Sequence, residues 1–440
     1  MRQVEAIYKT FFEPLLKDDE DKILQLRQSM LLRKGIRYFD FTASGLASKI
    51  INKRLKSFLP YYANTHSLAS TNAIITTQMY QMAKEKIREA LGLEKDFVIL
   101  SVGSGATAAI KMFQEIMGIY IPPKTKQRIP LSLLQDLPQV FVGPYEHHSN
   151  EISFREGLCQ TTRIPLNNAG LFDLESLKTQ VAHAHNLLIG SFNLASNVTG
   201  LITPYEEVSE ILRQKGGIIA FDMASSAPYM NIPSHLFDAC YVSPHKFLGG
   251  IGSCGILAIR EKLVDTDLPP TFAGGGTIKN SNRLIHSYLE DIGQRQEAGT
   301  PPVLQTLIAS LSFALRNEVG LGLIAQREHI LTQSLIYELK QIPATTIYGN
   351  LDVRRLGAVA FNVGGIHPHT LAEELSVKYG IQVRSGCSCA GPYGCDLFGL
   401  NDELKDKPNW LRVSVHYTHT LADIEYFVES LKKAIKSLRG

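Results

Sequence analysis

Lys246 carries a nucleophilic side chain in an unusual local setting. It lies in Ser243-Pro-His-Lys-Phe-Leu-Gly-Gly250, which follows a short predicted strand. In this segment the lysine is flanked by a histidine, an aromatic residue and two glycines. Burial in such a turn lowers the pKa of a lysine, which makes its amine nucleophilic and suits Schiff-base chemistry. A solvated lysine on a loop is the alternative interpretation of this residue taken alone.

Asp222 ends an apolar run, Gly217-Ile-Ile-Ala-Phe-Asp222, and precedes a series of small residues. A carboxylate in that place needs a positive ligand atom or local hydrogen bonds, because desolvation otherwise raises its pKa. An aspartate that caps a strand-to-helix turn is the alternative.

Two further turns suit the phosphate and the ring of a cofactor. Gly103-Ser-Gly-Ala-Thr107 stands between a predicted strand and a helix, where free N–H groups favour a phosphate. A tight turn capped by Thr107 is the alternative. In Tyr145-Glu-His-His-Ser-Asn150 a flat imidazole can stack on a ring. Adjacent histidines rarely point at one ion, so we expect no metal.

Together these four features meet the requirements of pyridoxal 5'-phosphate. Its aldehyde needs a lysine, its pyridine nitrogen needs an acidic partner, and its phosphate needs a nest of neutral or positive groups. The set is more specific than any one member, and it predicts pyridoxal 5'-phosphate as the cofactor.

The order of these motifs resembles the class V aminotransferase superfamily of fold-type I pyridoxal-phosphate enzymes. Within it, the sequence is most similar to the cysteine desulfurase and selenocysteine lyase branch. The similarity extends from about Phe39 to about Val428. Besides the Lys246 segment, the matching motifs are Glu146-His-His-Ser-Asn150, Ser196-Asn-Val-Thr-Gly200, Glu297-Ala-Gly-Thr-Pro301 and Arg384-Ser-Gly-Cys-Ser-Cys389.

The resemblance implies a role for each matching residue. Lys246 would form the Schiff base and move protons, His147 would stack on the ring, and Asp222 would pair with the pyridine nitrogen. Asn197 would contact the ring hydroxyl and the substrate. Arg412 would hold the substrate α-carboxylate with its bidentate fork, a surface arginine being the alternative. The implied phosphate ligands are Gly105, Ala106, Thr107, Ser243, His245 and, from a second subunit, Thr300. The resemblance therefore implies a homodimer.

Two positions complicate the resemblance. Ser225 stands where the family has a glutamine, and its shorter side chain would reach the ring oxygen only through water or not at all. Cys389 falls where desulfurases of this branch carry the persulfide-forming cysteine, with Cys387 and Cys395 nearby. A turn of small residues with an inert Cys389 is one alternative. A zinc knuckle is another, although Cys-x-Cys is not the usual structural zinc spacing.

The expected function is removal of sulfur or selenium from a small cysteine-like amino acid, which leaves alanine. Lys246 would deprotonate Cα and Cys389 would attack the substrate's sulfur, with a sulfur-acceptor protein as a further partner. A class V aminotransferase, an epimerase or another amino-acid lyase would need Lys246 and Arg412 but no thiol. A non-catalytic scaffold and a dinucleotide-binding enzyme are the remaining alternatives, and the glycine spacing of Gly103-Ser-Gly-Ala-Thr107 disfavours the second.

The elements that must position these residues follow an α/β pattern, because short β-branched runs alternate with longer amphipathic stretches. With the resemblance, this predicts a fold-type I aminotransferase-like fold: a large, mainly parallel sheet sandwiched by helices, and a smaller α+β C-terminal domain. We expect a segment 1–39 that packs on the small domain, a cofactor domain 40–310 and a small domain 311–440. Strands are predicted at 97–101, 139–142, 186–190 and 217–222, and helical patterns at 76–91, 204–215 and 307–339.

Composition limits the partners and the compartment. The chain has 440 residues and a formal net charge of +3, which gives no polycation for nucleic acid. The N-terminus has no apolar signal-peptide core and no apolar run is long enough to span a membrane. Six cysteines in a chain this long suit a reducing compartment. We expect a cytoplasmic protein that binds neither nucleic acid nor membrane.

Overall fold

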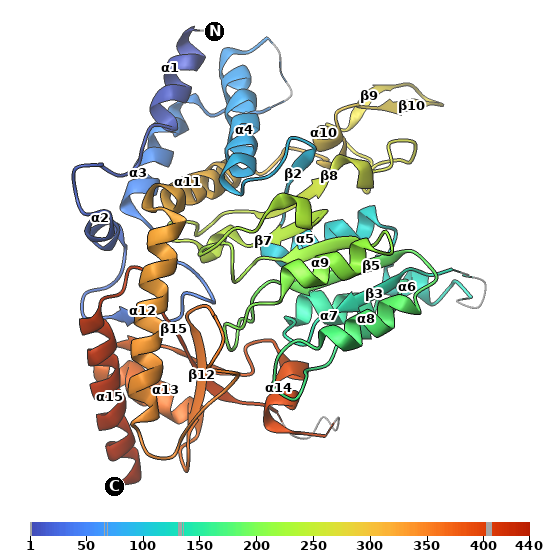
Figure 1. Ribbon diagram of the computed structural model, residues 1–440. Coiled ribbons are helices and arrows are strands. Elements are labelled where there is room, and N and C mark those ends of the chain that lie inside the picture. The colour runs from blue at the N-terminus through green and yellow to red at the C-terminus, as the bar shows by residue number, and fades with distance from the viewer. Residues whose placement is uncertain (1, 66, 68, 131–133, 135, 402–406) are drawn as a thin grey trace.

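The fold is known from a computed structural model, which describes residues 2–65, 67, 69–130, 134, 136–401 and 407–440. A seven-stranded sheet lies at its centre, with the order β2-β8-β7-β6-β5-β3-β4 (Figure 1). The β4, β3, β5, β6 and β7 strands run parallel to one another, and β8 runs antiparallel to both β7 and β2. The strands are β2 (Phe97–Val102), β3 (Gln139–Val142), β4 (Gln160–Arg163), β5 (Leu188–Asn193), β6 (Ile218–Asp222), β7 (Ala239–Val242) and β8 (Gly255–Arg260).

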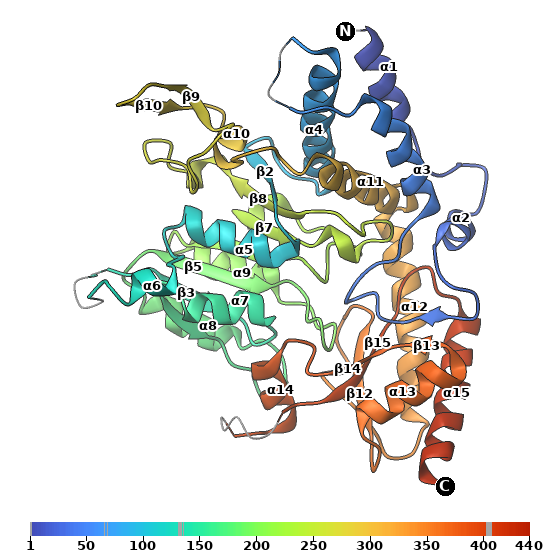
Figure 2. The same cartoon turned by 180° about the vertical axis from the view of Figure 1, so that it is seen from behind.

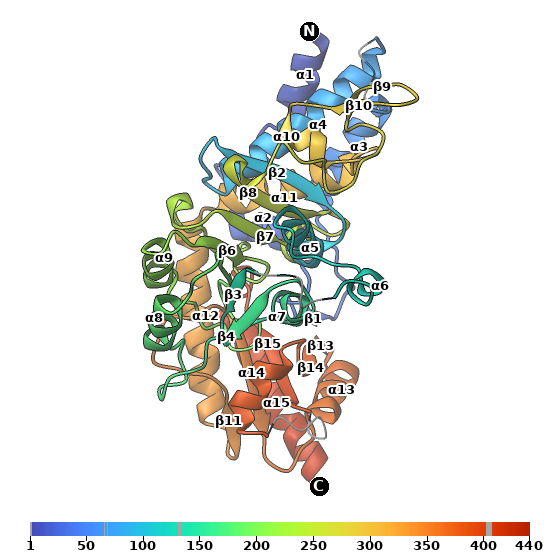
Figure 3. The ribbon, with the colours of Figure 1, turned by 90° about the vertical axis from the view of Figure 1, so that its right-hand side faces the viewer.

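Helices cover both faces of this sheet, which is why its central strands β5, β6 and β7 are almost entirely buried and largely apolar. Figure 3 shows the sheet nearly edge-on, with helices on both of its sides. On one side lie α8 (Leu174–Ala182) and α9 (Tyr205–Arg213), and on the other α5 (Gly105–Ile116), α6 (Pro123–Lys126) and α7 (His148–Arg155). The two sides have separate buried apolar clusters.

A second, four-stranded antiparallel sheet has the order β11-β12-β15-β14. Its strands are β11 (Thr345–Ile347), β12 (Ala358–Val363), β14 (Arg384–Gly386) and β15 (Trp410–Ser414). Its apolar cluster includes residues of α12 (Leu321–Lys340), α13 (Pro368–Tyr379) and α15 (Leu421–Arg439). Figure 2 shows α14 (Gly391–Phe398) between this sheet and the large one.

The N-terminal part of the chain has buried residues in both regions. It contains α1 (Arg2–Phe11), α2 (Lys22–Ser29), β1 (Arg37–Tyr38) and α3 (Lys49–Phe58), followed by α4 (Thr71–Ala90). Phe11 and Leu26 belong to the cluster that also holds residues of α4 and α11 (Val303–Val319). Phe39 belongs to the cluster of the second sheet, and β1 pairs with β13 (Ile381–Gln382).

The mixed α/β class with a large, mostly parallel sheet is confirmed, and each predicted strand and helix has a counterpart. The long helical pattern over 307–339 is two helices rather than one. Gly320 separates α11 from α12 with a φ of 94°, a left-handed value that ends the first helix, and the two axes meet at 76°. In the described part of the chain, no single helix is long and apolar enough to cross a membrane; α11 and α12 meet both requirements only together, as this bent pair.

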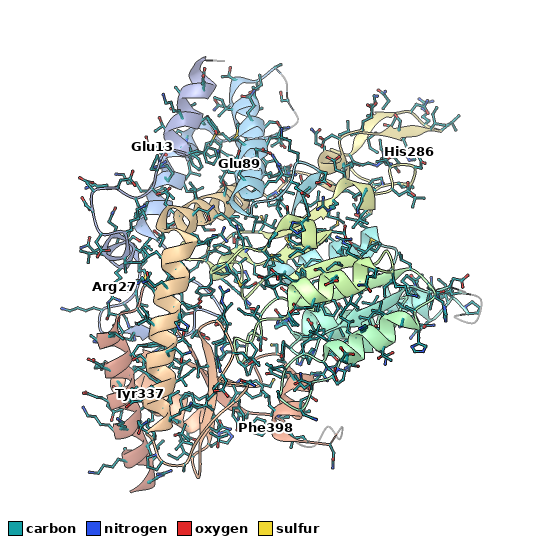
Figure 4. All side chains as sticks on the ribbon, in the orientation of Figure 1. Glu13, Arg27, Glu89, His286, Tyr337 and Phe398 are labelled. Atoms are coloured by element: carbon teal, nitrogen blue, oxygen red, sulfur yellow. The ribbon has the colours of Figure 1, made fainter. Side chains whose placement is uncertain are left out.

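A β-hairpin projects from the large sheet. It consists of β9 (Ile278–Ser281) and β10 (His286–Tyr288). A glycine-containing loop precedes it, and the short α10 (Ile292–Gln296) follows it. His286, labelled in Figure 4, marks its outer end. The side chains of Leu284 and Ile285 at its tip are 92% and 70% exposed.

Candidate active site

A cavity of about 190 Å³ lies between the two sheets, at the carboxyl ends of the parallel strands. Open α/β sheets place their ligand sites at this edge. The predicted residues that line it are Gly105, Ala106, Thr107, His147, Asn197, Asp222, Ser225, Ser243, His245, Lys246 and Arg412. Cys389 and Thr300, both within the described part of the chain, are not among its lining residues.

One end of the cavity is built for an anion by the N-terminus of α5. Gly105 begins this helix with a φ of 62°, and a Cβ there would lie 2.9 Å from the imidazole of His245 and from Ser243 Oγ. The N–H of Ala106 donates to Ser243 Oγ at 2.8 Å, and the hydroxyls of Thr107 and Ser149 are 2.7 Å apart. The first turn of α5 carries no acidic residue. Backbone N–H groups and hydroxyls at a helix start favour a phosphate.

The partly buried Lys246 and the buried Asp222 both line the cavity and affect each other's pKa. Burial lowers the pKa of Lys246 to about 8, while the nearby Asp222 opposes that shift. Burial raises the pKa of Asp222. Two neighbours oppose this rise: the Ala224 N–H, which donates to Asp222 Oδ1 at 2.9 Å, and Lys246. A neutral amine is thereby accessible near neutral pH.

His147 is held as a neutral ring at the start of α7. Its Nδ1 accepts a hydrogen bond from the Ser149 N–H at 3.1 Å. Burial, assisted by the charge of Lys246, lowers its pKa to about 3. A neutral imidazole in a fixed orientation suits stacking on an aromatic ring.

Glu146 anchors the turn that carries His147. The sequence alone indicates no role for its carboxylate. Its buried carboxylate accepts hydrogen bonds from Gly143 N at 2.9 Å, Asn193 N at 2.8 Å and Asn150 Nδ2 at 2.6 Å. These bonds join the ends of β3 and β5 to α7. Burial raises the pKa of Glu146 to about 8, against these donors. The motif around His147 contains this acid, but its spacing alone does not show what the carboxylate holds.

Arg412 is 2% exposed, so the surface-arginine alternative is wrong. Its Nη1 donates to the Asn197 carbonyl at 2.8 Å and its Nη2 to Asp40 Oδ1 at 2.6 Å. Arg384 lies directly opposite Arg412 in the β14–β15 pairing and also lines the cavity. Among the described residues, Arg384 has no ion-pair partner within 4.0 Å. Asp40 and Arg384 are thus site residues that the sequence did not single out, although Arg384 begins the cysteine motif.

Ser225 does not extend toward the cavity as a glutamine would. Its hydroxyl donates to the carbonyl of Ala195. By contrast, the buried Asn197 Oδ1 has no hydrogen-bond partner in the described part of the chain, while Nδ2 donates to the Ser388 carbonyl at 2.7 Å. The ring-hydroxyl contact predicted for Asn197 would satisfy this acceptor.

The site thus fits pyridoxal 5'-phosphate on the chemistry of its own groups. It offers an anion cradle closed by Gly105, an amine beside a carboxylate, a neutral imidazole and an unpartnered amide oxygen. By contrast, no group of three or more His, Cys, Asp or Glu side chains in the described ranges could hold a metal ion.

Comparison with known proteins agrees with this geometry. The family model for class-V aminotransferases matches residues 37–427. This chain belongs to the class-V aminotransferase family. The family uses pyridoxal 5'-phosphate, so the predicted cofactor and the predicted enzyme class are confirmed.

Other proteins that are similar to this chain, both curated relatives and solved structures, align with nearly its whole length. A probable cysteine desulfurase from Streptomyces coelicolor is 28% identical, with 90% of this chain and 91% of the relative aligned. One from Pyrococcus abyssi is 26% identical over 94% of this chain and 98% of its own. The structure of a cysteine desulfurase from Thermococcus onnurineus NA1 has a TM-score of 0.80 at 25% identity and covers 94% and 98% of the two chains. A cysteine desulfurase from Escherichia coli, at 21% identity, shares the fold with a TM-score of 0.75, and the alignment covers 95% of this chain and 99% of that chain.

Proposed function

We propose that this class-V enzyme removes sulfur from L-cysteine and releases alanine. The observation that carries the proposal is the arrangement of Lys246, Asp222 and Arg412 around one cavity whose wall includes Ser388, the neighbour of Cys389. The relatives named as probable cysteine desulfurases, at 26–28% identity, support the same substrate class. Selenocysteine, which carries selenium in place of sulfur, would fit the same contacts.

The residues of the cavity divide the work between binding and proton transfer. Arg412 binds the substrate α-carboxylate, and Asn197, bonded to it through the backbone carbonyl, faces the same region. When bound, pyridoxal 5'-phosphate supplies an electron sink joined to the substrate's amino group. The neutral amine of Lys246 takes the proton from the substrate Cα, and the neutral, fixed imidazole of His147 would hold the cofactor ring by stacking. Asp222, whose Oδ1 accepts the Ala224 N–H at 2.9 Å, would be the acidic partner of the ring nitrogen.

Cys389 supplies the sulfur-accepting thiol. Its thiolate Sγ attacks the substrate's sulfur, so that an S–S bond forms and the Cβ–S bond breaks. The bonding pair of the broken bond stays with the substrate carbon, which takes up a proton and becomes the methyl group of alanine. The persulfide on Cys389 then passes its outer sulfur to an external thiol, on a reductant or on a sulfur-acceptor protein.

A second candidate function is an aminotransferase, epimerase or lyase that uses no thiol. It is favoured by the position of Cys389, which does not line the cavity within the described part of the chain. This candidate predicts turnover of amino acids that is indifferent to replacement of Cys389.

We further propose that the enzyme acts as a homodimer, in which Thr300 completes the phosphate site of the partner. Thr300 is exposed and lines a different cavity, beside α4, rather than the one that contains Lys246. The exposed Leu284 and Ile285 of the hairpin offer apolar surface for a second copy. Sedimentation equilibrium tests this proposal, since a monomer with full activity would contradict it.

The six cysteines are all free thiols, which supports a reducing compartment, and we propose the cytoplasm.

The function is tested with purified protein, added pyridoxal 5'-phosphate and L-cysteine in the presence of dithiothreitol. Wild-type enzyme is expected to show the visible absorbance of a lysine-bound cofactor and to release sulfide and alanine in equal amounts. Lys246→Ala should lose both, and Cys389→Ala should keep the absorbance and lose sulfide. Cys387→Ala and Cys395→Ala are matched controls and should keep both. Sulfide release that persists in Cys389→Ala would contradict the assignment of the thiol.

A further inference from the structure

The turn that carries Cys389 has a strained backbone. Ser388 and Cys389 have φ values of 52° and 56°, in the left-handed region that residues other than glycine seldom adopt. Such conformations cost free energy and persist only where surrounding contacts hold them. The contacts that hold this turn are therefore of interest for how Cys389 is presented.

Side chains from three distant segments hold the turn. Asn197 Nδ2 donates to the Ser388 carbonyl at 2.7 Å, and Trp410 Nε1 donates to Ser388 Oγ at 3.1 Å. These two contacts fix Ser388, whereas the backbone of Cys389 is held by a different element. This element is α7, whose first residue, His148, bonds to the Cys389 carbonyl.

His148 bonds to the chain at Cys389 and again at Gly391, on either side of Ala390. Its backbone N–H donates to the Cys389 carbonyl at 2.8 Å, and its Nε2 accepts the N–H of Gly391 at 2.8 Å. A Cβ on residue 391 would lie 3.0 Å from Nε2, so glycine allows the close approach of the ring to the backbone. Nε2 can accept this bond only in the neutral imidazole, and burial together with the charge of Arg155 lowers the pKa of His148.

We propose that His148 is a positioning residue that latches the Cys389 turn onto the large sheet. The inference rests on the proposed function, in which Cys389 accepts sulfur. With the latch closed, Ser388 rather than Cys389 lines the cavity. Opening it lets the strained turn relax, so that Sγ can move between the substrate and an external thiol acceptor. His147 serves the ring and its neighbour His148 serves the thiol, which accounts for both histidines of the motif without a metal.

Two variants separate the latch from a general structural role. His148→Ala removes the acceptor for Gly391, whereas His148→Gln can place an amide oxygen close to the position of Nε2. His183→Ala is the control, because His183 is exposed at the end of α8 and its Nδ1 bonds to the Thr179 carbonyl of the same helix. Amide hydrogen exchange of the peptide that contains Gly391, and the rate at which iodoacetamide alkylates Cys389, are measured on the cofactor-loaded enzyme. Cys159 serves as an internal reference thiol.

His148→Ala is expected to speed both Gly391 exchange and Cys389 alkylation about fivefold, the effect of one lost hydrogen bond. Alkylation of Cys159 and the cofactor absorbance should not change, and His148→Gln should restore rates near those of the wild type. Unchanged rates in His148→Ala, or a glutamine variant as fast as the alanine variant, would overturn the latch. Neither readout requires turnover. Sulfide release that ignores Cys389 would therefore refute the proposed function without affecting these rates.

Discussion

Replacing Asp40 by asparagine is expected to destabilise the folded protein and, at the same time, to strengthen substrate binding. Asp40 Oδ1 lies 2.6 Å from Arg412 Nη2, and the two side chains are 19% and 2% exposed. Without substrate, this carboxylate is the counter-charge of a buried guanidinium. A substrate carboxylate that binds Arg412 must share the guanidinium with Asp40 or displace it. Removal of the Asp40 charge therefore acts in opposite directions on the free and the bound enzyme.

The magnitude follows from the type of hydrogen bond that changes. A bond to a charged group contributes about 1.5–3 kcal/mol and a neutral one about 1 kcal/mol, so Asp40→Asn should cost about 1.5 kcal/mol. An unfolding entropy of about 2.1 cal/mol/K per residue over 440 residues predicts a fall in Tm of about 2 °C. The same free energy, gained on binding, lowers the dissociation constant of a carboxylate ligand about tenfold.

The assay uses L-alanine, the proposed product, as an inhibitor of sulfide release from L-cysteine, alongside thermal unfolding of the cofactor-loaded enzyme. Asp423→Asn is the matched control, because Asp423 Oδ2 pairs with Arg27 Nη1 at 2.7 Å and neither residue lines the cavity. Arg27 lies at the periphery of the molecule (Figure 4). The control should lower Tm and leave alanine inhibition unchanged. A Tm that falls in Asp40→Asn while alanine binds no tighter would refute the reasoning, since Asp40 would then orient Arg412 rather than compete for it.

Three further predictions concern buried ionisable groups and one glycine. Burial raises the pKa of Glu328 from 4.5 to about 8, so folding disfavours the carboxylate and stability falls as pH rises through this window. Glu328→Gln should therefore raise Tm by about 5 °C at pH 8 and change it little at pH 4.5, as measured by scanning fluorimetry. Burial lowers the pKa of Lys246 from 10.5 to about 8, so the stability of the cofactor-free protein should rise between these pH values. Urea unfolding of Lys246→Met should lack that rise, and an equal slope in both proteins would contradict the shift. A Cβ at Gly250 would lie 1.8 Å from the Pro244 carbonyl oxygen, so Gly250→Ala should cost about 3 kcal/mol and weaken cofactor retention in gel filtration. Gly322→Ala, with nothing within 4 Å, is its control and should be neutral or slightly stabilising.

The fold was largely predictable because its signals are local. Apolar runs that end in polar or glycine residues mark β3, β5 and β6, and the motif residues that follow strands meet where parallel strands end. The break at Gly320 was missed because a single glycine in a helical pattern is often tolerated, and only its φ of 94° decides the matter. The division at residues 39/40 and 310/311 stays a prediction.

The part of the site that the sequence did not predict comes from tertiary packing. Asp40 reaches Arg412 across 372 residues of chain, and no spacing rule connects two such positions. The hydroxyl of Ser225 bonds to Ala195 instead of facing a ring, which depends on how two turns pack. Likewise, the motif that ends at Cys389 contains two cysteines but does not show that its turn adopts a left-handed backbone.

The most direct test of the central claim is a single turnover with L-cysteine and no reductant, followed by measurement of alanine and by mass analysis of the peptide that contains Cys389. The account predicts stoichiometric alanine and a mass increase of one sulfur atom on Cys389, with neither in Lys246→Ala. Alanine formed without sulfur on Cys389, or a keto acid in place of alanine, would contradict it.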